Sequence, residues 1–272
     1  MKTFSESPLQ MFATAWQNRG LILALTKREV IGRYKGSALG LLWSFFNPLF
    51  MLIVYTFVFS QVFKSRWPGG SDSKIEFALL LFSGLMVFNL FSECLGRAPG
   101  LVLANPNYVK KVVFPLEILP FVSLGSALFH LLISLGVWIL FYLLFFGMPH
   151  LTLLLFPFVI IPLLLLVLGF SWFLASLGVY LRDVGQVVGI IITALMFLSP
   201  LFFPITSLPQ EYQGVIHFSP ITVALEEARQ VMYWGKGIDW QVWSVYLGIS
   251  LFIAWIGFAW FQKTRRGFAD VM

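Results

Sequence analysis

Residues 118–181 read ILPFVSLGSALFHLLISLGVWILFYLLFFGMPHLTLLLFPFVIIPLLLLVLGFSWFLASLGVYL. No Asp, Glu, Lys or Arg interrupts this run. A hydrocarbon core of about 30 Å is crossed by roughly 20 helical residues, so the run is far longer than one crossing needs. Gly and Pro interrupt helices, and both occur near its middle in Gly147-Met148-Pro149-His150. The run therefore predicts two membrane-spanning helices joined by a turn.

The rest of the chain repeats this pattern of long apolar blocks separated by short charged segments. Hydrophobic residues make up 59% of the chain and charged residues 11%, with a mean hydropathy of +0.87. This balance is outside the range of soluble domains. We expect an all-α integral membrane protein with six spans, at about residues 38–63, 75–95, 117–146, 151–181, 185–204 and 240–262. The second apolar block is short, so its helix is expected to extend past Glu76 or Glu93.

The spans belong to one transmembrane domain, residues 36–265, between a cytoplasmic interfacial helix at 1–35 and a cytoplasmic tail at 266–272. Apolar residues recur at helical spacing before the first span, and basic residues lie on the opposite side. This pattern favours an amphipathic helix in the inner membrane interface, and an ordinary cytoplasmic helix packed on the loops is the alternative. The residues we assign to this interface are Trp16, Lys27, Arg28 and Arg33.

The basic residues set the orientation. The net charge is +6, but the basic residues are scattered at block ends rather than gathered on one face, which argues against a nucleic-acid partner. With alternating loops and an inside amino terminus, thirteen of the 18 Lys and Arg residues lie inside and five outside. Both termini are therefore expected on the cytoplasmic side of the membrane, with anionic lipid of the inner leaflet as a partner.

Two inside loops are candidates for contact with a partner protein. Residues 97–115 are polar and broken by Pro and Gly, which suits a short helix outside the bilayer. Lys110 and Lys111 also fit simple anchors at the lipid headgroups, and the two interpretations are compatible. The second loop, residues 180–185, contains Arg182 and Asp183 and is by default a structural turn.

The fifth span ends in Leu-Ser-Pro-Leu-Phe-Phe-Pro at residues 198–204. Two prolines within five residues must break the helical hydrogen-bond ladder, and the freed carbonyls need protein or water around them. Residues 205–239 are too polar to span simply but contain apolar stretches. We expect short re-entrant helices here, on the outer side between spans five and six.

Several of these segments together resemble one known family. Arg28-Glu29, the run RYKGS at 33–37, Leu39-Gly40, Trp43 and Asn47-Pro48 precede or open the first span. The run NPNYVKKVVFPLEILP at 105–120 and the segments 180–185 and 198–204 follow in order. This arrangement resembles the type-two ABC exporter permeases for polysaccharide, over roughly residues 28–265. Leu116 departs from the family pattern, which often has a charged residue there.

The resemblance implies the permease subunit of an ATP-driven exporter that moves undecaprenyl-diphosphate-linked O-antigen polysaccharide across the inner membrane. It implies a homodimer with two copies of a separate ABC ATPase, which would bind ATP and Mg. Capsular polysaccharide and teichoic acid are alternative cargoes. No G-x-x-x-x-G-K-[ST] phosphate loop occurs in the sequence, so this chain is not expected to hydrolyse ATP or bind a cofactor. The expected ATPase-coupling residues are Pro106, Tyr108, Lys110, Lys111, Arg182 and Asp183.

The resemblance also implies a channel for a sugar chain. Aromatic residues make up 18% of the sequence, and their planes can pack against the C–H faces of sugar rings. Phe facing lipid and Trp or Tyr in interfacial belts explain most of them equally well. The expected channel-lining residues combine helical spacing with a position near polar or broken segments: Asn47, Tyr55, Phe59, Phe197, Phe202 and Phe203.

Two other classes of function compete with an exporter. A membrane enzyme acting on lipid-linked sugars would need an acid or base, and His130 lies within a span, where ionisable groups often mark function. His130 has no carboxylate within its own span, so a histidine with satisfied hydrogen bonds, or one facing a pore, is favoured. A passive channel would need acidic rings, yet the middle of every span lacks carboxylates. Cys94 is the single cysteine, so we expect no cysteine-based metal site.

Overall fold

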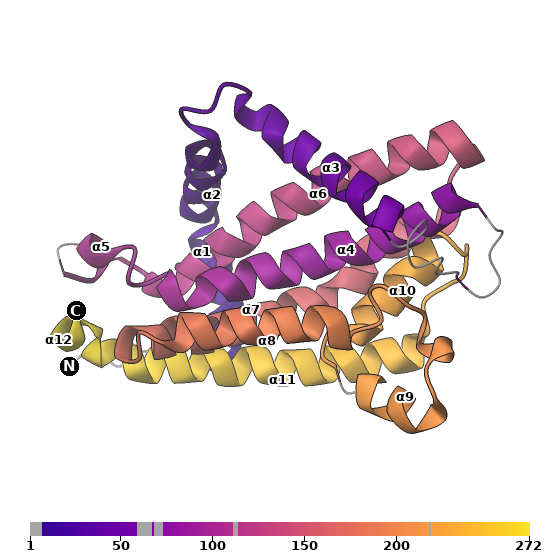
Figure 1. The fold of residues 1–272 in the computed structure, drawn as a ribbon. Helices are drawn as coiled ribbons and strands as arrows, with labels where there is room; N and C mark the ends of the chain where they lie inside the picture. Colours follow the sequence, from indigo (N-terminus) through magenta and orange to yellow (C-terminus); the bar gives the residue numbers. More distant parts are fainter. Residues whose placement is uncertain (1–6, 59–66, 68–72, 111–113, 218) are drawn as a thin grey trace.

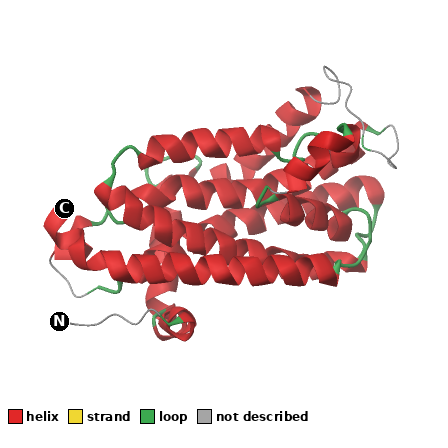
Figure 2. Ribbon diagram, turned by 90° about the horizontal axis from the view of Figure 1, so that it is seen from below, coloured by secondary structure: helices red, strands yellow, loops and turns green. Residues whose placement is uncertain are grey.

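A computed structural model describes residues 7–58, 67, 73–110, 114–217 and 219–272. Among the described residues all regular elements are helices, as Figure 2 shows by colour. The all-α expectation is therefore confirmed for this part of the chain.

Within the described ranges, four helices are long and apolar enough to cross a membrane. They are α4 (Lys74–Arg97), α6 (Leu119–Phe146), α7 (Phe156–Tyr180) and α11 (Trp240–Thr264). Two shorter apolar helices run with them, α3 (Trp43–Phe57) and α8 (Val184–Leu198). In Figure 1 the chain passes through these helices alternately between two ends, one marked by α5 (Pro106–Lys110) and the other by α10 (Thr222–Met232). We call them the α5 end and the α10 end.

The helix boundaries follow from local chemistry. α4 extends past both Glu76 and Glu93, which lengthens its short apolar block. α6 ends at Gly147, whose φ of +84° favours glycine. α8 ends at Leu198, just before Ser199 and Pro200, as the proline-rich segment predicted. The expected first span reached residue 63, but residues 59–66 lie outside the described part of the chain, which leaves α3 as its described portion.

α4 is the central helix of the bundle and is buried along nearly its whole length. It contacts α3, α6, α7, α8 and α10. α7 and α11 pack against each other through glycines, since a Cβ placed on Gly257 would lie 2.0 Å from the carbonyl oxygen of Gly169. Small residues at such a crossing allow close backbone approach, which is how helices associate in lipid.

The amino-terminal segment forms two helices rather than the single one expected. α1 (Pro8–Gln17) and α2 (Arg19–Tyr34) meet at Asn18, whose side-chain amide donates a hydrogen bond to the Thr14 carbonyl at 2.9 Å. That local bond competes with continuation of the helix. Figures 1 and 2 show α2 running across the long helices rather than along them. Trp16 is 70% exposed while Met11 is buried, so α1 has one packed and one exposed side, and its place in the membrane interface stays a prediction.

The carboxyl-terminal segment is also more ordered than expected. Residues 266–272 were predicted to be a simple tail, but they include α12 (Phe268–Val271). Phe268 is fully buried and its ring contacts those of Tyr180 and Phe261. Burial of this aromatic ring ties the segment to α7 and α11.

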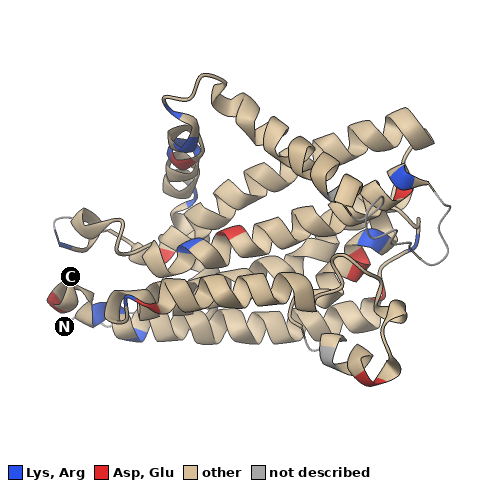
Figure 3. Ribbon diagram, viewed as in Figure 1, with Lys and Arg blue, Asp and Glu red and all other residues tan. Residues whose placement is uncertain are grey.

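The segment between α8 and α11 forms the short helices that its sequence predicted. They are a 3-10 turn at Ile205–Ser207, α9 (Gln210–His217) and α10. α10 packs on α4 and α7, and its residues Ala224, Leu225 and Ala228 are almost completely buried. Figure 3 shows the charged residues mainly at the two ends of the bundle and on α2.

Candidate functional site

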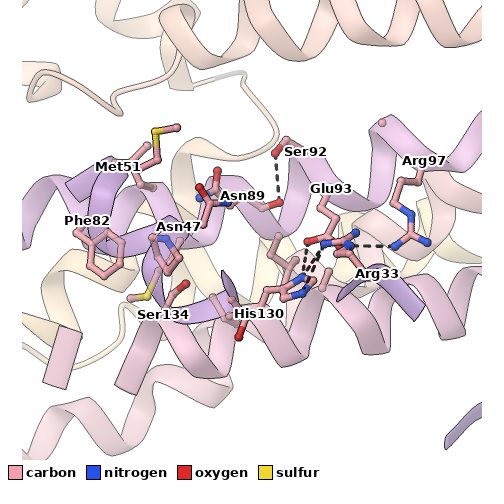
Figure 4. A pocket seen from close by; sticks show the side chains of 18 of the residues that line it. Arg33, Asn47, Met51, Phe82, Asn89, Ser92, Glu93, Arg97, His130 and Ser134 are labelled. Atoms are coloured by element: carbon pink, nitrogen blue, oxygen red, sulfur yellow. Dashed lines mark hydrogen bonds and ion pairs between the residues drawn. The ribbon is translucent and has the colours of Figure 1, made fainter. Parts of the chain in front are cut away.

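The main candidate site is a cavity of about 530 Å³ between the end of α2 and helices α3, α4 and α6. Figure 4 shows that its lining changes along its length: Met51 and Phe82 lie at one end, and charged side chains lie at the other. Amide and hydroxyl groups lie between them. The polar lining residues include Asn47, Asn89, Ser92 and Ser134.

The charged end of the cavity is a cluster of side chains from three helices. Arg33 of α2 forms an ion pair with Glu93 of α4, with 2.5 Å between Nη2 and Oε1. His130 of α6 lies with Nδ1 2.9 Å from Oε2 of the same carboxylate and Nε2 3.0 Å from the Tyr34 hydroxyl. A carboxylate only accepts, so this geometry places a proton on Nδ1 and lets Nε2 accept from Tyr34. We call Arg33, Tyr34, Glu93 and His130 the α2 cluster.

A second arginine extends the α2 cluster toward the α5 end. Arg97 of α4 pairs with Glu29 of α2 and lies 3.6 Å from the Glu93 carboxylate. Two arginines and two glutamates balance one another in charge, which lowers the cost of holding them at a helix junction. Burial raises the pKa of the Tyr34 hydroxyl, so this group stays protonated and able to donate at neutral pH. The arrangement fastens α2 to α4 and α6.

The chemistry available here is binding and positioning. Among the described residues, no group of three or more His, Cys, Asp or Glu side chains could hold a metal ion. His130 is held by a carboxylate and a hydroxyl. This carboxylate could not be found within the span of His130, because Glu93 comes from the neighbouring helix. The histidine with satisfied hydrogen bonds that we favoured is nevertheless what the structure contains.

The predicted channel residues are divided between two places. Asn47 lines the cavity, whereas Phe197 lies on an exposed groove along α8 with Gln186 and Thr193. Phe202 is buried next to Phe197, with 5.8 Å between ring centroids. Phe203 is half-buried. Phe59 and the side chain of Tyr55 lie outside the described residues, and the roles of all six residues stay predictions.

The predicted coupling residues lie at the α5 end. Pro106 and Lys110 are exposed on α5, and Tyr108 is half-buried. The Tyr108 ring stacks on Phe114 with 4.1 Å between centroids, and its hydroxyl accepts a hydrogen bond from Arg28 at 2.8 Å. Arg182 and Asp183 are exposed between α7 and α8, whose junction lies at the same end in Figure 1. Lys111 lies outside the described residues.

The interfacial residues lie on two sides of α1 and α2. Trp16 is exposed, and the Arg19 guanidinium lies 4.7 Å from the centre of its ring. Lys27 and Arg28 are exposed as well. Arg33, which the sequence assigned to the lipid interface, pairs with Glu93 on α4, and its role at the interface stays a prediction. An arginine with a carboxylate partner in reach is better satisfied there than in the headgroup region.

Comparison with known proteins gives consistent matches. Residues 20–233 match the family described as ABC-2 type transporter. The chain is 25% identical over 264 residues to the O-antigen export system permease protein RfbA of Myxococcus xanthus, covering 96% of this chain and 99% of that one. A protein of the same name from Klebsiella pneumoniae is 24% identical over 253 residues, or 93% of this chain and 95% of that one. The polysialic acid transport protein KpsM of Escherichia coli is 25% identical over 242 residues, covering 85% and 89%.

Proposed function

The chain belongs to the ABC-2 type transporter family, and from this premise we propose that it is the permease subunit of an ATP-driven polysaccharide exporter. The cargo we propose is undecaprenyl-diphosphate-linked O-antigen glycan, moved outward across the bacterial inner membrane. One observation carries the proposal: the similarity to an O-antigen export permease extends over 96% of this chain and 99% of that protein.

The proposed topology has six spans, with α3 and α8 crossing together with the four longer helices. Its support is the alternation of these helices between the two ends of the bundle (Figure 1). The α5 end is then cytoplasmic, since most Lys and Arg residues belong to that side. α1 and α2 lie in the inner interface with Trp16 toward lipid, and α9 and α10 lie on the outer side.

We propose that a separate ABC ATPase, in two copies with bound ATP and Mg, drives the export. The sequence has no phosphate-binding loop of its own. The exposed part of α5 and the turn at Arg182 and Asp183 present a surface at one end of the bundle, where such a partner could press. Contact there would reach α2 through the hydrogen bond between Tyr108 and Arg28.

The α2 cluster would transmit a movement of α5 and α2 to the membrane-spanning helices. α2 is joined to α4 and α6 by Arg33, Glu93 and His130, and these helices form the walls of the cavity. A shift of α5 would therefore move α2 as a rigid lever and change the width of the cavity. The exposed fractions of Arg33 and Glu93, 37% and 18%, leave the pair able to rearrange at modest cost.

The working unit we propose is a homodimer of this chain. α8 exposes Gln186 and Thr193 on the same groove as Phe197. Polar groups on a spanning helix are disfavoured against lipid and usually face protein or a water-filled path. A second copy facing this groove would enclose a channel in which polar groups meet sugar hydroxyls and Phe197 meets ring faces.

Capsular polysaccharide is the second candidate cargo. It is favoured by the similarity to the polysialic acid transport protein KpsM, which covers 85% of this chain. The two cargoes share a long hydrophilic glycan on a lipid anchor, and the cavity and the α8 groove suit both. Supplying O-antigen glycan and capsular glycan to the same purified complex shows which of the two cargoes it exports.

The test is export in sealed vesicles that contain the permease with its ATPase facing out. Lipid-linked O-antigen glycan is supplied on the ATPase side and measured in the lumen by glycan-specific enzymatic digestion. We expect accumulation only with permease, ATPase and ATP together. Vesicles with an ATPase that binds but cannot hydrolyse ATP are the matched control. Export of a capsular glycan alone would overturn the O-antigen proposal, and no export by a folded complex would overturn the exporter.

A further inference from the structure

The α10 end contains a completely buried arginine. Arg229 lies in α10 with its side chain 1% exposed. Its guanidinium donates to the carbonyl oxygens of Leu80 at 3.2 Å, Pro200 at 2.5 Å and Leu201 at 2.8 Å. It also pairs with Glu226, one helical turn earlier, at 2.8 Å. Arg229 is one of the five basic residues that the charge count assigned to the outer side, and the structure shows that its side chain is buried in protein.

The carbonyls that Arg229 reaches belong to two different elements. Leu80 is in α4, whereas Pro200 and Leu201 are in the break that follows α8. Pro200 and Leu201 lie beyond the end of α8, so no N–H of a continuing helix is available to their carbonyls. Ser199 and Leu201 are fully buried, so water cannot satisfy this segment from the surface. Arg229 satisfies it instead.

Neighbouring residues are fitted to this guanidinium. A Cβ on Gly84 would lie 2.6 Å from its Nη2, so the space depends on a glycine. The Trp67 ring lies 4.4 Å from its central carbon on another side, a cation–π distance. A charge removed from water in this way is costly unless every donor has a partner. The surroundings of Arg229 are therefore built for an arginine.

We propose that Arg229 is a positioning residue that clamps residues 199–204 against α4 and so holds the α10 end of the transport path closed at rest. The inference rests on the proposed exporter function. The clamped segment includes Phe202, which is 6% exposed and contacts the Phe197 ring. Holding the segment holds these rings in place.

The test measures how readily residue 202 becomes accessible. Phe202→Cys is introduced into the full permease in complex with its ATPase in lipid vesicles, and the rate of reaction with a membrane-impermeant maleimide is followed without ATP. The native Cys94 is 1% exposed and gives the background rate. Arg229→Lys keeps the charge but cannot reach three carbonyls from a planar fork. Gly84→Ala keeps the arginine but displaces it.

We expect Arg229→Lys and Gly84→Ala each to raise the labelling rate at residue 202 by about tenfold or more. Loss of one charge-assisted hydrogen bond makes local opening of the segment easier by about this factor. Arg266→Lys, on an exposed arginine, and Gly136→Ala, where a Cβ meets nothing within 4 Å, are the matched controls and should not change it. A second reporter, Val102→Cys, is buried at the α5 end and detects general loosening.

An unchanged rate at residue 202 in Arg229→Lys, or equal acceleration at residues 102 and 202, overturns the clamp. If Arg229→Lys does not assemble, Gly84→Ala decides alone by the same criteria. Labelling requires no glycan, so a failed clamp is distinguishable from a failed exporter. Slow labelling of Phe202→Cys with Arg229 intact, together with no export by the wild-type protein, contradicts the function and leaves the clamp standing.

Discussion

The α2 cluster and the Arg229 clamp both use an arginine to join helices, but they do so in different surroundings. Arg33 is 37% exposed and binds a carboxylate on a neighbouring helix. Arg229 is 1% exposed and binds mainly backbone carbonyls. A partly solvated ion pair can break and re-form cheaply, whereas a buried guanidinium without its acceptors is strongly unfavourable. The first junction suits an element that moves readily, and the second suits one that is held in place at rest and opens only at a larger cost in free energy.

The sharpest way to break this comparison is to remove Arg229. Arg229→Met is expected to lower the free energy of unfolding by about 3–5 kcal/mol, because buried carbonyls and Glu226 lose a charged partner together. Thermal denaturation in detergent micelles measures the change. Arg266→Met at an exposed position should stay within about 0.5 kcal/mol of wild type. Equal melting of the two variants would show that Arg229 is not a fixed junction.

The next effect comes from the glycine that makes room for the guanidinium. Gly84→Ala is expected to cost about 1–3 kcal/mol, since the added methyl overlaps Nη2 and forces it to move. Gly136→Ala, with open space around it, should be neutral or slightly stabilising. Because both changes act on one contact, Gly84→Ala combined with Arg229→Met should cost less than their sum. If the two changes in the free energy of unfolding are strictly additive, Gly84 does not act through its contact with Arg229.

At the α2 cluster a smaller effect on stability but a clear effect on coupling is expected. Glu93→Gln weakens the acceptor for Arg33 and His130 and should cost about 1 kcal/mol, because the pair is partly solvated. ATP-driven export should fall further than this stability loss explains, while binding of the ATPase is unchanged. Combining Glu93→Gln with His130→Gln in a double-mutant cycle measures their coupling. If the folded Glu93→Gln variant exports glycan normally, the α2 cluster does not transmit movement from the ATPase to the cavity.

The smallest change is at the contact between α5 and α2. Tyr108→Phe removes the hydroxyl that accepts from Arg28 and keeps the ring stack on Phe114, so stability should fall by only about 0.5 kcal/mol. The number of ATP molecules hydrolysed per glycan exported should rise, because a shift of α5 is then transmitted less completely to α2. Tyr212→Phe, on an exposed tyrosine of α9, is the matched control. An unchanged ratio in Tyr108→Phe would place the coupling elsewhere.

Part of the fold could be predicted because it depends on local chemistry. The charge-free blocks predicted apolar helices, and the glycine at residue 147 and the proline at residue 200 mark where two of them end. The short helix near Pro106 and those between residues 205 and 239 were also expected from their sequence. The break at Asn18 was missed, because it depends on one side-chain hydrogen bond within a pattern that reads as continuous helix.

The site was harder to predict than the helices. The pairing of Glu93 with His130 joins two helices, and no spacing within one span reveals it. An acidic residue near the end of one span, followed by a histidine about three turns into the next, is the signal that could have suggested it. Arg229 gave no such signal, because its partners are backbone carbonyls that every residue possesses.

The sequence by itself determined that the chain is built from apolar helices and that its charges gather between them, because transfer of side chains between water and lipid depends on composition alone. Only the tertiary structure decided which charges meet. Arg33 and Arg229 are the same residue type beside apolar helices, yet one has a carboxylate across a helix junction and the other has freed carbonyls at a proline break. Those partners come from packing between distant segments, which local sequence does not encode.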